Sequence, residues 1–378
     1  MRIAVPVELE GETRVAATPE TVRKFIALGA QVVVQAGAGL KSGVLDSEYV
    51  AAGAEIAASL PEAVAQVDVV LAVRRPPAAA LKGAKPGAAV VCIADPYGAN
   101  DALNEFAAAG VRLFGMELMP RITRAQVMDV LSSQANLAGY RAIVDGAAEY
   151  GRALPMMMTA AGTVSAARIF IMGVGVAGLQ AIATARRMGA IVTATDVRPA
   201  TKEQVESLGA KFLAVEDDEF KQAQTAGGYA KEMSADYQAK QAALTASHIA
   251  KQDIVVTTAL IPGRPAPKLI SAEMVASMRP GSVIVDLAVE RGGNCELSKP
   301  GEIFVTDNGV KIFGLLNLPG RLAATASQLY AKNLFAFVET MIDKEKKVLA
   351  INFGDELVAA TLLVNDGAVV HPNFQTKA

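Results

Sequence analysis

Histidine, cysteine and tryptophan are scarce in this sequence: its 378 residues include two histidines, two cysteines and no tryptophan. His248 and His371 provide too few imidazoles for a histidine-based metal site or a Ser-His-Asp triad. Cys92 and Cys295 are not spaced as metal ligands, so we expect two unreactive thiols in a reducing compartment. The net charge of −2 provides no basic excess, which argues against nucleic acid as a partner.

An uninterrupted hydrophobic segment of membrane-spanning length is also missing. The uncharged run 169–185 comes nearest, but Gly173, Gly175 and Gly178 interrupt it. The first residues, MRIAVPVELEGE, reach acidic side chains too soon for a signal peptide. We therefore expect a soluble protein, with any link to a membrane made by a partner.

Alternating apolar and helical segments fill the chain instead. Its length exceeds the size of about 250–300 residues at which a single core stops growing, so we expect two domains. Strands are predicted at 2–7, 32–35, 69–73, 89–94, 111–114, 211–215, 253–258, 282–287, 348–353, 357–364 and 368–372. Helices are predicted at 19–28, 46–52 and 321–342, with a long helix or helix pair at 124–150. This alternation favours parallel sheets with helices on both faces.

One stretch, residues 167–196, carries the clearest chemical signal. It predicts a strand, a tight turn, a helix and a second strand, at 169–171, 177–188 and 191–195 for the regular elements. The turn has the spacing G-x-G-x-x-G, formed by Gly173, Gly175 and Gly178. This spacing in that structural context is typical of dinucleotide-binding proteins, whereas the glycines alone would also suit plain packing.

Each segment of this stretch has a physical task in binding a dinucleotide. Gly173 permits the sharp turn, Gly175 lets the backbone approach a pyrophosphate, and Gly178 lets the helix pack on the strand. The helix N-terminus attracts the phosphates. Asp196 can accept hydrogen bonds from ribose hydroxyls and would repel a 2′-phosphate, which favours NAD(H), while the nearby Arg198 acts in the opposite direction.

Two polar groups before this stretch allow more than one interpretation. Gln126, Asp129 and Ser132 are spaced by three, so they would share a helix face or converge on a ligand in a loop, together with Arg121. The same residues also suit a helix start with its capping groups. The pair Arg74–Arg75 follows a predicted strand, where it either lines a ligand crevice or forms a solvated loop.

The polar segment 216–240 also leaves two interpretations open. Gly227 and Gly228 make a flexible point, with Tyr229 and Met233 just beyond it. Long polar insertions near ligand sites often act as lids, and Tyr229 and Met233 would be the closing side chains. The alternative is an exposed helical hairpin without a function.

Longer motifs in this order identify a family. They are MELMPRITRAQVMDVLSSQANLAGYRAIVDGA, PMMMTAAGTV, GVGVAGLQAIATARRMGA, TDVRPATKEQVESLGAKF, TAGGYAKEM, TTALIPGRPAP and VIVDLAVERGGNCELS. Over nearly the whole chain they closely resemble the NAD(H)-binding component of proton-translocating nicotinamide nucleotide transhydrogenase, in the form of a separate alpha-type subunit. The resemblance implies that NADH bound here passes a hydride to NADP⁺ on a partner domain, coupled to proton movement through a membrane component. Such a reaction needs two nicotinamides held together rather than an acid or base, which agrees with the scarcity of histidine.

The resemblance also implies the site residues. The hydride-transfer loop around the nicotinamide would contain Arg121, Gln126, Asp129 and Ser132. The adenosine, the pyrophosphate, the mobile loop and the remaining wall would be contacted by Gly173, Gly175, Val176, Gly178, Asp196, Val197, Arg198, Gly228, Tyr229, Met233, Gln241 and Leu260.

The family implies an architecture and partners as well. We expect an α/β protein with two Rossmann-like, doubly wound parallel-sheet domains separated by a cleft and joined by long crossing helices. The domains would be 1–131 with 322–378, and 132–321 for NAD(H). We expect a homodimer, an NADP(H)-binding beta subunit and a membrane-spanning subunit, and a cytoplasmic location at the inner membrane through these partners.

Alanine dehydrogenase, which has the same two-domain fold, is the nearest competing enzyme. Arg14 resembles its pyruvate-binding arginine, but Arg74 stands where that family has a lysine. Its catalytic histidine is missing from 94–97, and its catalytic aspartate is Glu290 here. A dehydrogenase of a small amino acid and a non-catalytic NAD(H) sensor are therefore the alternatives to a transhydrogenase subunit. The chain also departs from the transhydrogenase pattern at Val7 and at Leu315–Leu316.

Overall fold

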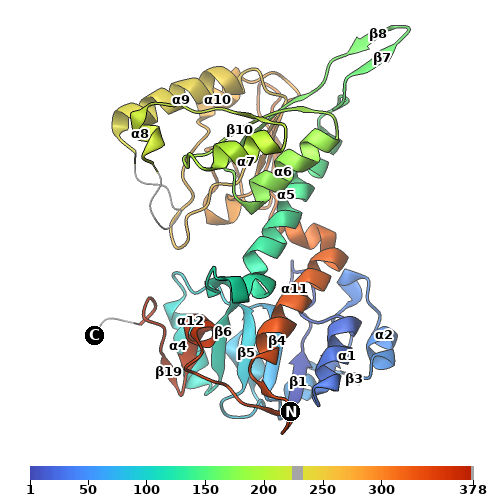
Figure 1. Ribbon diagram of the computed structural model, residues 1–378. Helices are drawn as coiled ribbons and strands as arrows, with labels where there is room; N and C mark the ends of the chain where they lie inside the picture. The colour runs from blue at the N-terminus through green and yellow to red at the C-terminus, as the bar shows by residue number, and fades with distance from the viewer. Residues whose placement is uncertain (224–232, 376–378) are drawn as a thin grey trace. The chain divides into compact units, whose positions relative to one another are not determined.

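The computed structural model describes residues 1–223 and 233–375 (Figure 1). The chain divides into two compact units. Unit 1 comprises Met1–Gln134 and Pro319–Ala378, and unit 2 comprises Ala135–Leu318. Each unit contains its own mostly parallel sheet with helices on both faces, as the sequence predicts.

The sheet of unit 1 has β1 at the point where the strand order reverses. Within the described residues its order is β19-β18-β6-β5-β4-β1-β2-β3, and only β18 runs antiparallel to the other strands. Its strands are β1 (Arg2–Val5), β2 (Gln31–Gln35), β3 (Glu55–Ala57), β4 (Val69–Arg74), β5 (Ala89–Ile93), β6 (Arg112–Gly115), β18 (Leu362–Asn365) and β19 (Ala368–Val369). The run from Val69 to Val73 is buried throughout because β4 lies inside the sheet with both faces covered.

Helices cover both faces of this sheet. Alternate strand residues face opposite sides, so Ile3 packs with one set of helices and Ala4 with the other. The helices are α1 (Pro19–Ala27), α2 (Asp46–Ala51), α3 (Leu60–Val64), α4 (Asn100–Ala108), α11 (Ala323–Glu339) and α12 (Glu356–Thr361). Residues of α1, α2, α11 and α12 share the core of Ile3, and residues of α3 and α4 share the core of Ala4. A short hairpin of β16 (Ile342–Asp343) and β17 (Val348–Leu349) follows α11.

The prediction of a strand over 357–364 is wrong in its first half. Residues 356–361 form α12, and the strand begins only at Leu362. The Asp355 side chain accepts a hydrogen bond from the Leu357 N–H at 2.8 Å and so caps the helix. Leu357, Val358 and Thr361 are buried at helical spacing. The cap and this spacing outweigh the strand preference of Val358 and Thr361.

The sheet of unit 2 begins with β9, which lies inside the sheet. Its order within the described residues is β11-β10-β9-β12-β13-β15-β14, with only β14 antiparallel. The strands are β9 (Arg168–Met172), β10 (Ile191–Thr195), β11 (Lys211–Phe212), β12 (Ile254–Thr257), β13 (Val283–Asp286), β14 (Ile303–Val305) and β15 (Lys311–Phe313). Because the chain continues to β10 on one side of β9 and later to β12 on the other, the strand order reverses between β9 and β12.

The helices of unit 2 are divided between the two faces of this sheet. They are α6 (Val176–Arg187), α7 (Thr201–Ser207), α8 (Asp218–Lys221), α9 (Ala235–Ile249), α10 (Ala272–Ser277) and most of α5 (Val130–Glu149). Residues of α5, α6 and α7 pack with Ile169 and Ile171, whereas residues of α9 and α10 pack with Phe170. An antiparallel hairpin of β7 (Met157–Thr159) and β8 (Gly162–Val164), which the sequence did not predict, projects from the unit as a thin arm (Figure 1).

Of the two alternatives predicted for 124–150, a long helix or a helix pair, the structure has two helical segments. Thr123–Met128 is a 3-10 helix, and α5 begins at Val130 after a break at Asp129. Among all helices within the described residues, none is both long enough and apolar enough to cross a membrane.

Candidate functional site

The glycine turn of unit 2 has no space for side chains at two of its three glycines. Gly173 has φ +102°, which favours glycine, and a Cβ added there would lie 2.5 Å from Thr258 Oγ1. A Cβ added at Gly178 would lie 1.9 Å from the carbonyl oxygen of Gly173. These contacts explain why both positions are glycine: β9, α6 and the segment after β12 meet at backbone distance.

The third glycine of the turn faces open space. A Cβ added at Gly175 would have no described atom within 4 Å. Gly175 is the N-cap of α6, and among the described residues no side chain caps this helix start. The first N–H groups of a helix lack partners within the helix. The turn thus combines backbone donors, a positive helix end and free space, which fits the pyrophosphate of a dinucleotide.

Asp196 follows β10 directly and is tied to the turn. Its Oδ2 accepts the Val174 N–H at 2.8 Å, and its Oδ1 accepts the Arg198 N–H at 2.9 Å. Arg198 also donates Nε to Oδ1 and Nη2 to Oδ2, both at 2.9 Å. The pair with Asp196 holds the pKa of the Arg198 guanidinium above its usual range. The sequence placed both residues at the site but did not predict that they would bind each other.

Exposed apolar side chains lie at the same edge of the sheet. Val176 is at the start of α6, Val197 follows Asp196, and Leu260 follows β12. Their side chains are 39%, 45% and 52% exposed. β10, β9 and β12 are parallel neighbours, so their carboxyl ends lie at the same edge of the sheet. The three residues follow these strand ends, at the point where the strand order reverses. Open α/β sheets bind their ligands at this point.

The segment after β12 is held by an asparagine that the sequence did not single out. Asn294 is fully buried; its Oδ1 accepts the Ala259 N–H at 3.0 Å, and its Nδ2 donates to the carbonyl oxygens of Ala259 and Pro267, both at 2.8 Å. Thr258 donates its hydroxyl to the Gly173 carbonyl oxygen at 2.9 Å. These bonds hold the backbone of residues 258 and 259, which precede Leu260. The motif that contains Asn294 entered the sequence interpretation only through the family resemblance.

Two predicted wall and loop residues are engaged inside unit 2. Gln241, on α9, accepts the Val215 N–H at 3.0 Å and donates to Thr195 Oγ1 at 3.3 Å, so it supports the end of β10 beside Asp196. Met233 is buried with residues of α8 and α9. Gly228 and Tyr229, the other predicted loop residues, lie outside the described residues.

The predicted hydride-transfer residues lie in unit 1, around the start of α5. Asp129 accepts the Ser132 N–H at 2.8 Å and the Ser132 hydroxyl at 2.5 Å. This is the bonding of a helix N-cap, so the capping interpretation applies to these two residues. Gln126 belongs to the preceding 3-10 helix, and both Gln126 and Arg121 are exposed.

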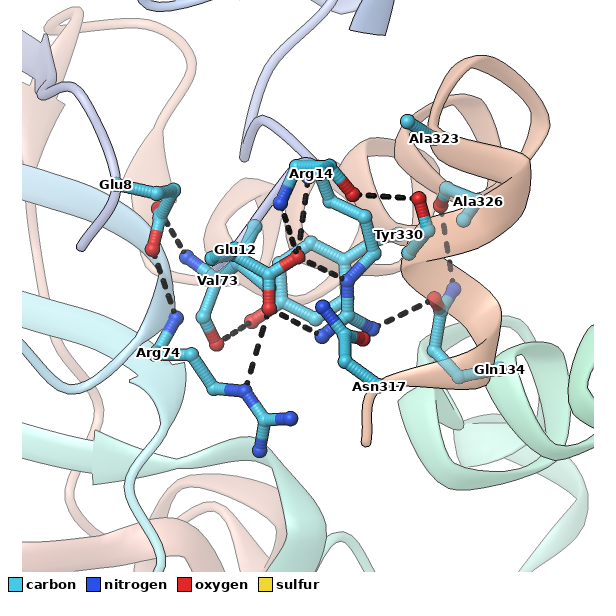
Figure 2. Close-up of polar contacts among 12 residues, drawn as sticks. Glu8, Glu12, Arg14, Val73, Arg74, Gln134, Asn317, Ala323, Ala326 and Tyr330 are labelled. Atoms are coloured by element: carbon cyan, nitrogen blue, oxygen red, sulfur yellow. Dashed lines mark hydrogen bonds and ion pairs between the residues drawn. The ribbon is translucent and has the colours of Figure 1, made fainter. Parts of the chain in front are cut away.

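A partly buried charged cluster lies at the carboxyl edge of the unit 1 sheet (Figure 2). Glu8 accepts the N–H groups of Val73 at 2.6 Å and Arg74 at 3.1 Å, so it joins the segment after β1 to the end of β4. Burial raises the pKa of the Glu8 carboxyl to about 7, although these hydrogen bonds act in the opposite direction. Arg74 Nε lies 3.3 Å from a Glu12 oxygen. Arg75 donates to the carbonyl oxygens of Ala94 and Asp95.

Arg14 is engaged on all three of its guanidinium nitrogens within unit 1 (Figure 2). Nε and Nη2 donate to Glu12 at 2.8 and 2.7 Å, and Nη1 donates to Gln134 Oε1 at 2.8 Å. The Arg14 side chain is only 2% exposed. This arginine therefore stabilises the N-terminal loop of unit 1 instead of being presented to solvent. Within the described residues, no three His, Cys, Asp or Glu side chains gather as they would around a metal ion.

Comparison with known proteins identifies the family. The sequence matches the model of the alanine dehydrogenase/PNT N-terminal domain over residues 4–138, and that of the C-terminal domain over 142–372. It is 54% identical over 378 residues to an NAD(P) transhydrogenase subunit alpha protein of Rhodospirillum rubrum, with 98% of each chain covered.

Solved structures agree with this assignment. The transhydrogenase from Sinorhizobium meliloti is 58% identical, with a TM-score of 0.89 over 98% of this chain and 100% of that chain. An L-alanine dehydrogenase is more distant, at 25% identity and a TM-score of 0.82 over 99% of this chain and 98% of that chain. The resemblance inferred from the motifs is confirmed by these matches. The chain belongs to the alanine dehydrogenase/PNT family, and its near relatives there are alpha subunits of NAD(P) transhydrogenase.

Proposed function

We propose that this chain is the NAD(H)-binding subunit of a proton-translocating transhydrogenase. In this function it passes a hydride between NADH bound here and NADP⁺ bound on a partner domain. The main support is its 54% identity, over 98% of both chains, to a transhydrogenase alpha subunit, together with the glycine turn and Asp196 of unit 2. We further propose that the two units correspond to the two domains expected at 1–131 with 322–378 and at 132–321.

The cofactor would be held by the carboxyl edge of the unit 2 sheet. Gly173, Gly175 and Gly178 and the first N–H groups of α6 would bind the pyrophosphate. The adenosine would be contacted by Val176, Asp196, Val197 and Arg198, and the rest of the cofactor by Gly228, Tyr229, Met233, Gln241 and Leu260. NADH, when bound, would donate the hydride, and NAD⁺ would accept it in the reverse reaction.

The work of the chain would be orientation rather than proton transfer. Hydride transfer between two nicotinamides requires rings held at near-contact distance, and no general acid or base takes part. The proposed orienting residues are Arg121, Gln126, Asp129 and Ser132. The bond between Asp129 and Ser132 keeps both side chains in one conformation at the start of α5, which supports such a role. The exposed Gln126 retains its amide for a ligand.

A homodimer belongs to the proposal, and the β7–β8 hairpin supports it. All six residues of the two strands are exposed. Apolar side chains on this arm are exposed by 58% at Met156, 42% at Met157, 79% at Met158 and 37% at Val164. An apolar arm of this kind is expected to be covered by another chain. The remaining partners would be an NADP(H)-binding domain and a membrane-spanning subunit, through which the chain would be attached to the inner membrane.

A mixing experiment tests the proposal. The purified chain is combined with the NADP(H)-binding domain of a transhydrogenase, NADH and an analogue of NADP⁺, and the reduced analogue is followed by absorbance. We expect transfer only when both proteins are present. No transfer despite tight NADH binding would contradict the proposal. Reduction of NAD⁺ by the chain alone with alanine would favour the dehydrogenase alternative, which the engaged state of Arg14 argues against.

A further inference from the structure

The carboxylate of Asp196 has no hydrogen-bonding capacity left in this structure. Each of its oxygens accepts two hydrogen bonds: Oδ1 from the Arg198 N–H and Nε, and Oδ2 from the Val174 N–H and Arg198 Nη2. All four contacts measure 2.8 or 2.9 Å. A carboxylate offers about four lone-pair positions. A ribose hydroxyl therefore finds no free acceptor on Asp196 while Arg198 keeps this position.

The four donors to Asp196 differ in their freedom to move. The N–H groups of Val174 and Arg198 belong to the backbone of the turn and of the residues after β10, which the fold fixes. The other two donors lie on the Arg198 guanidinium, whose side chain is 30% exposed against 7% for Asp196. A third bond, from Nη2 to the Val174 carbonyl oxygen, is longer at 3.2 Å. Only the guanidinium can leave without disturbing the backbone.

We infer that Arg198 is a latch on the adenosine site: its guanidinium binds the two carboxylate oxygens of Asp196 that the ribose hydroxyls would use, and these hydroxyls must displace it. This rests on the proposed function, since it concerns how the same site takes NAD(H). The departure of the guanidinium frees two lone-pair positions, and the 2′- and 3′-hydroxyls of the ribose need two. Breaking the ion pair is a cost that is subtracted from the affinity for NADH.

Although Arg198 is also proposed to contact the adenosine, its bond to Asp196 means that, on balance, it lowers the affinity for NADH. An ion pair whose arginine keeps 30% of its side chain exposed contributes about 1 kcal/mol, which corresponds to about fivefold in a dissociation constant. We expect Arg198→Ala to bind NADH about fivefold more tightly than the original chain. Arg198→Gln keeps most of the length of the side chain without its charge, and we expect it to change the affinity in the same direction.

The probes separate the latch from attraction between the guanidinium and the pyrophosphate. Binding of NADH is measured by fluorescence titration, and binding of adenosine by its competition with NADH. Adenosine carries the two ribose hydroxyls but no phosphate. A higher affinity of Arg198→Ala for adenosine therefore measures competition for Asp196 alone. In an Asp196→Asn background the gain on removing Arg198 is expected to disappear.

A matched control removes a nearby charge that does not touch Asp196. Lys202 pairs with Glu216 at 2.6 Å, four residues beyond Arg198. We expect Lys202→Ala to bind NADH and adenosine like the original chain. Circular dichroism and urea unfolding confirm that each variant is folded.

The outcomes are distinct. Tighter binding of both probes by Arg198→Ala and Arg198→Gln, but not by Lys202→Ala, supports the latch. Unchanged or weaker adenosine binding by folded Arg198→Ala and Arg198→Gln overturns it, while the proposed function stands if the original chain binds NADH. If the original chain does not bind NADH, the proposed function fails, and the latch with it.

Discussion

Gly175 and Gly178 give a matched pair of substitutions that separates folding from cofactor binding. A Cβ added at Gly178 would lie 1.9 Å from the Gly173 carbonyl oxygen and 2.9 Å from the carbonyl carbon. Because a Cβ atom hardly ever approaches another heavy atom closer than 3.0 Å, the start of α6 and the Gly173 turn must move apart by at least 1.1 Å. The obstacle is backbone, which cannot turn aside as a side chain can.

Gly178→Ala is therefore expected to destabilise the protein strongly. Overpacking of a core typically costs about 1–3 kcal/mol when side chains can rearrange. Since backbone meets backbone here, we expect at least about 3 kcal/mol less free energy of unfolding. Loss of NADH affinity should accompany it, because α6, the helix proposed to bind the pyrophosphate, is the element that moves.

Gly175→Ala should give the opposite combination. Within the described residues no atom lies within 4 Å of the added Cβ, and φ at this position is −81°, which alanine adopts freely. We expect the free energy of unfolding to stay within about 1 kcal/mol of the original. The methyl group would, however, occupy the space that we propose for the pyrophosphate. A lost hydrogen bond to a charged group costs about 1.5–3 kcal/mol, or tenfold and more in the NADH dissociation constant.

Urea unfolding and fluorescence titration with NADH measure the two effects on the same preparations. We predict that Gly178→Ala loses stability and that Gly175→Ala loses only affinity. The assignment of these two roles would be refuted if Gly175→Ala bound NADH like the original chain, or if Gly178→Ala unfolded at the same urea concentration as Gly175→Ala.

Three further substitutions test other features of the molecule. Gln126→Ala should slow hydride transfer far more than it weakens NADH binding; equal losses in a transfer assay and a titration would reduce Gln126 to a binding residue. Burial raises the pKa of Glu8 from 4.5 to about 7, so the folded state binds this proton more tightly than the unfolded chain does. The contribution of this proton to the free energy of unfolding is complete below pH 4.5 and is lost as the pH rises through 7. Between pH 4.5 and 7 the free energy of unfolding of Glu8→Gln, measured with urea, should change by up to about 3 kcal/mol less than that of the original chain. The same change in both proteins would show that Glu8 does not titrate in this range. Met158→Asp on the exposed hairpin arm should shift the protein from dimer to monomer in sedimentation equilibrium, whereas an unchanged mass would exclude this arm from the dimer contact.

The local fold around the proposed NAD(H) site could be predicted from the sequence because the interactions that form it are local. Strand β10 spans the predicted residues Ile191–Thr195, and α6 lies within one residue of its predicted ends. Buried parallel strands read as continuous apolar runs, as β4 does, and the glycines mark a turn that few other residues can form.

What the sequence did not predict depends on contacts between distant or unexpected partners. The bonds of Asn294 join residues up to 35 positions apart, and no local pattern indicates them. The pairing of Asp196 with Arg198 was not predicted because the same two residues also suit direct contact with a cofactor. The β7–β8 hairpin was missed because its strands are exposed on both faces and so lack apolar alternation.

The proposed function stands or falls with direct hydride transfer from NADH on this chain to NADP⁺ on a partner. A decisive experiment uses NADH that carries deuterium at the transferred position of C4, mixed with the chain, the NADP(H)-binding domain and an NADP⁺ analogue in ordinary water. We expect mass spectrometry to find the deuterium in the reduced analogue, because the hydride passes between the two rings without exchange with solvent. Reduced analogue that carries hydrogen from water, or no reduced analogue at all, would contradict direct transfer.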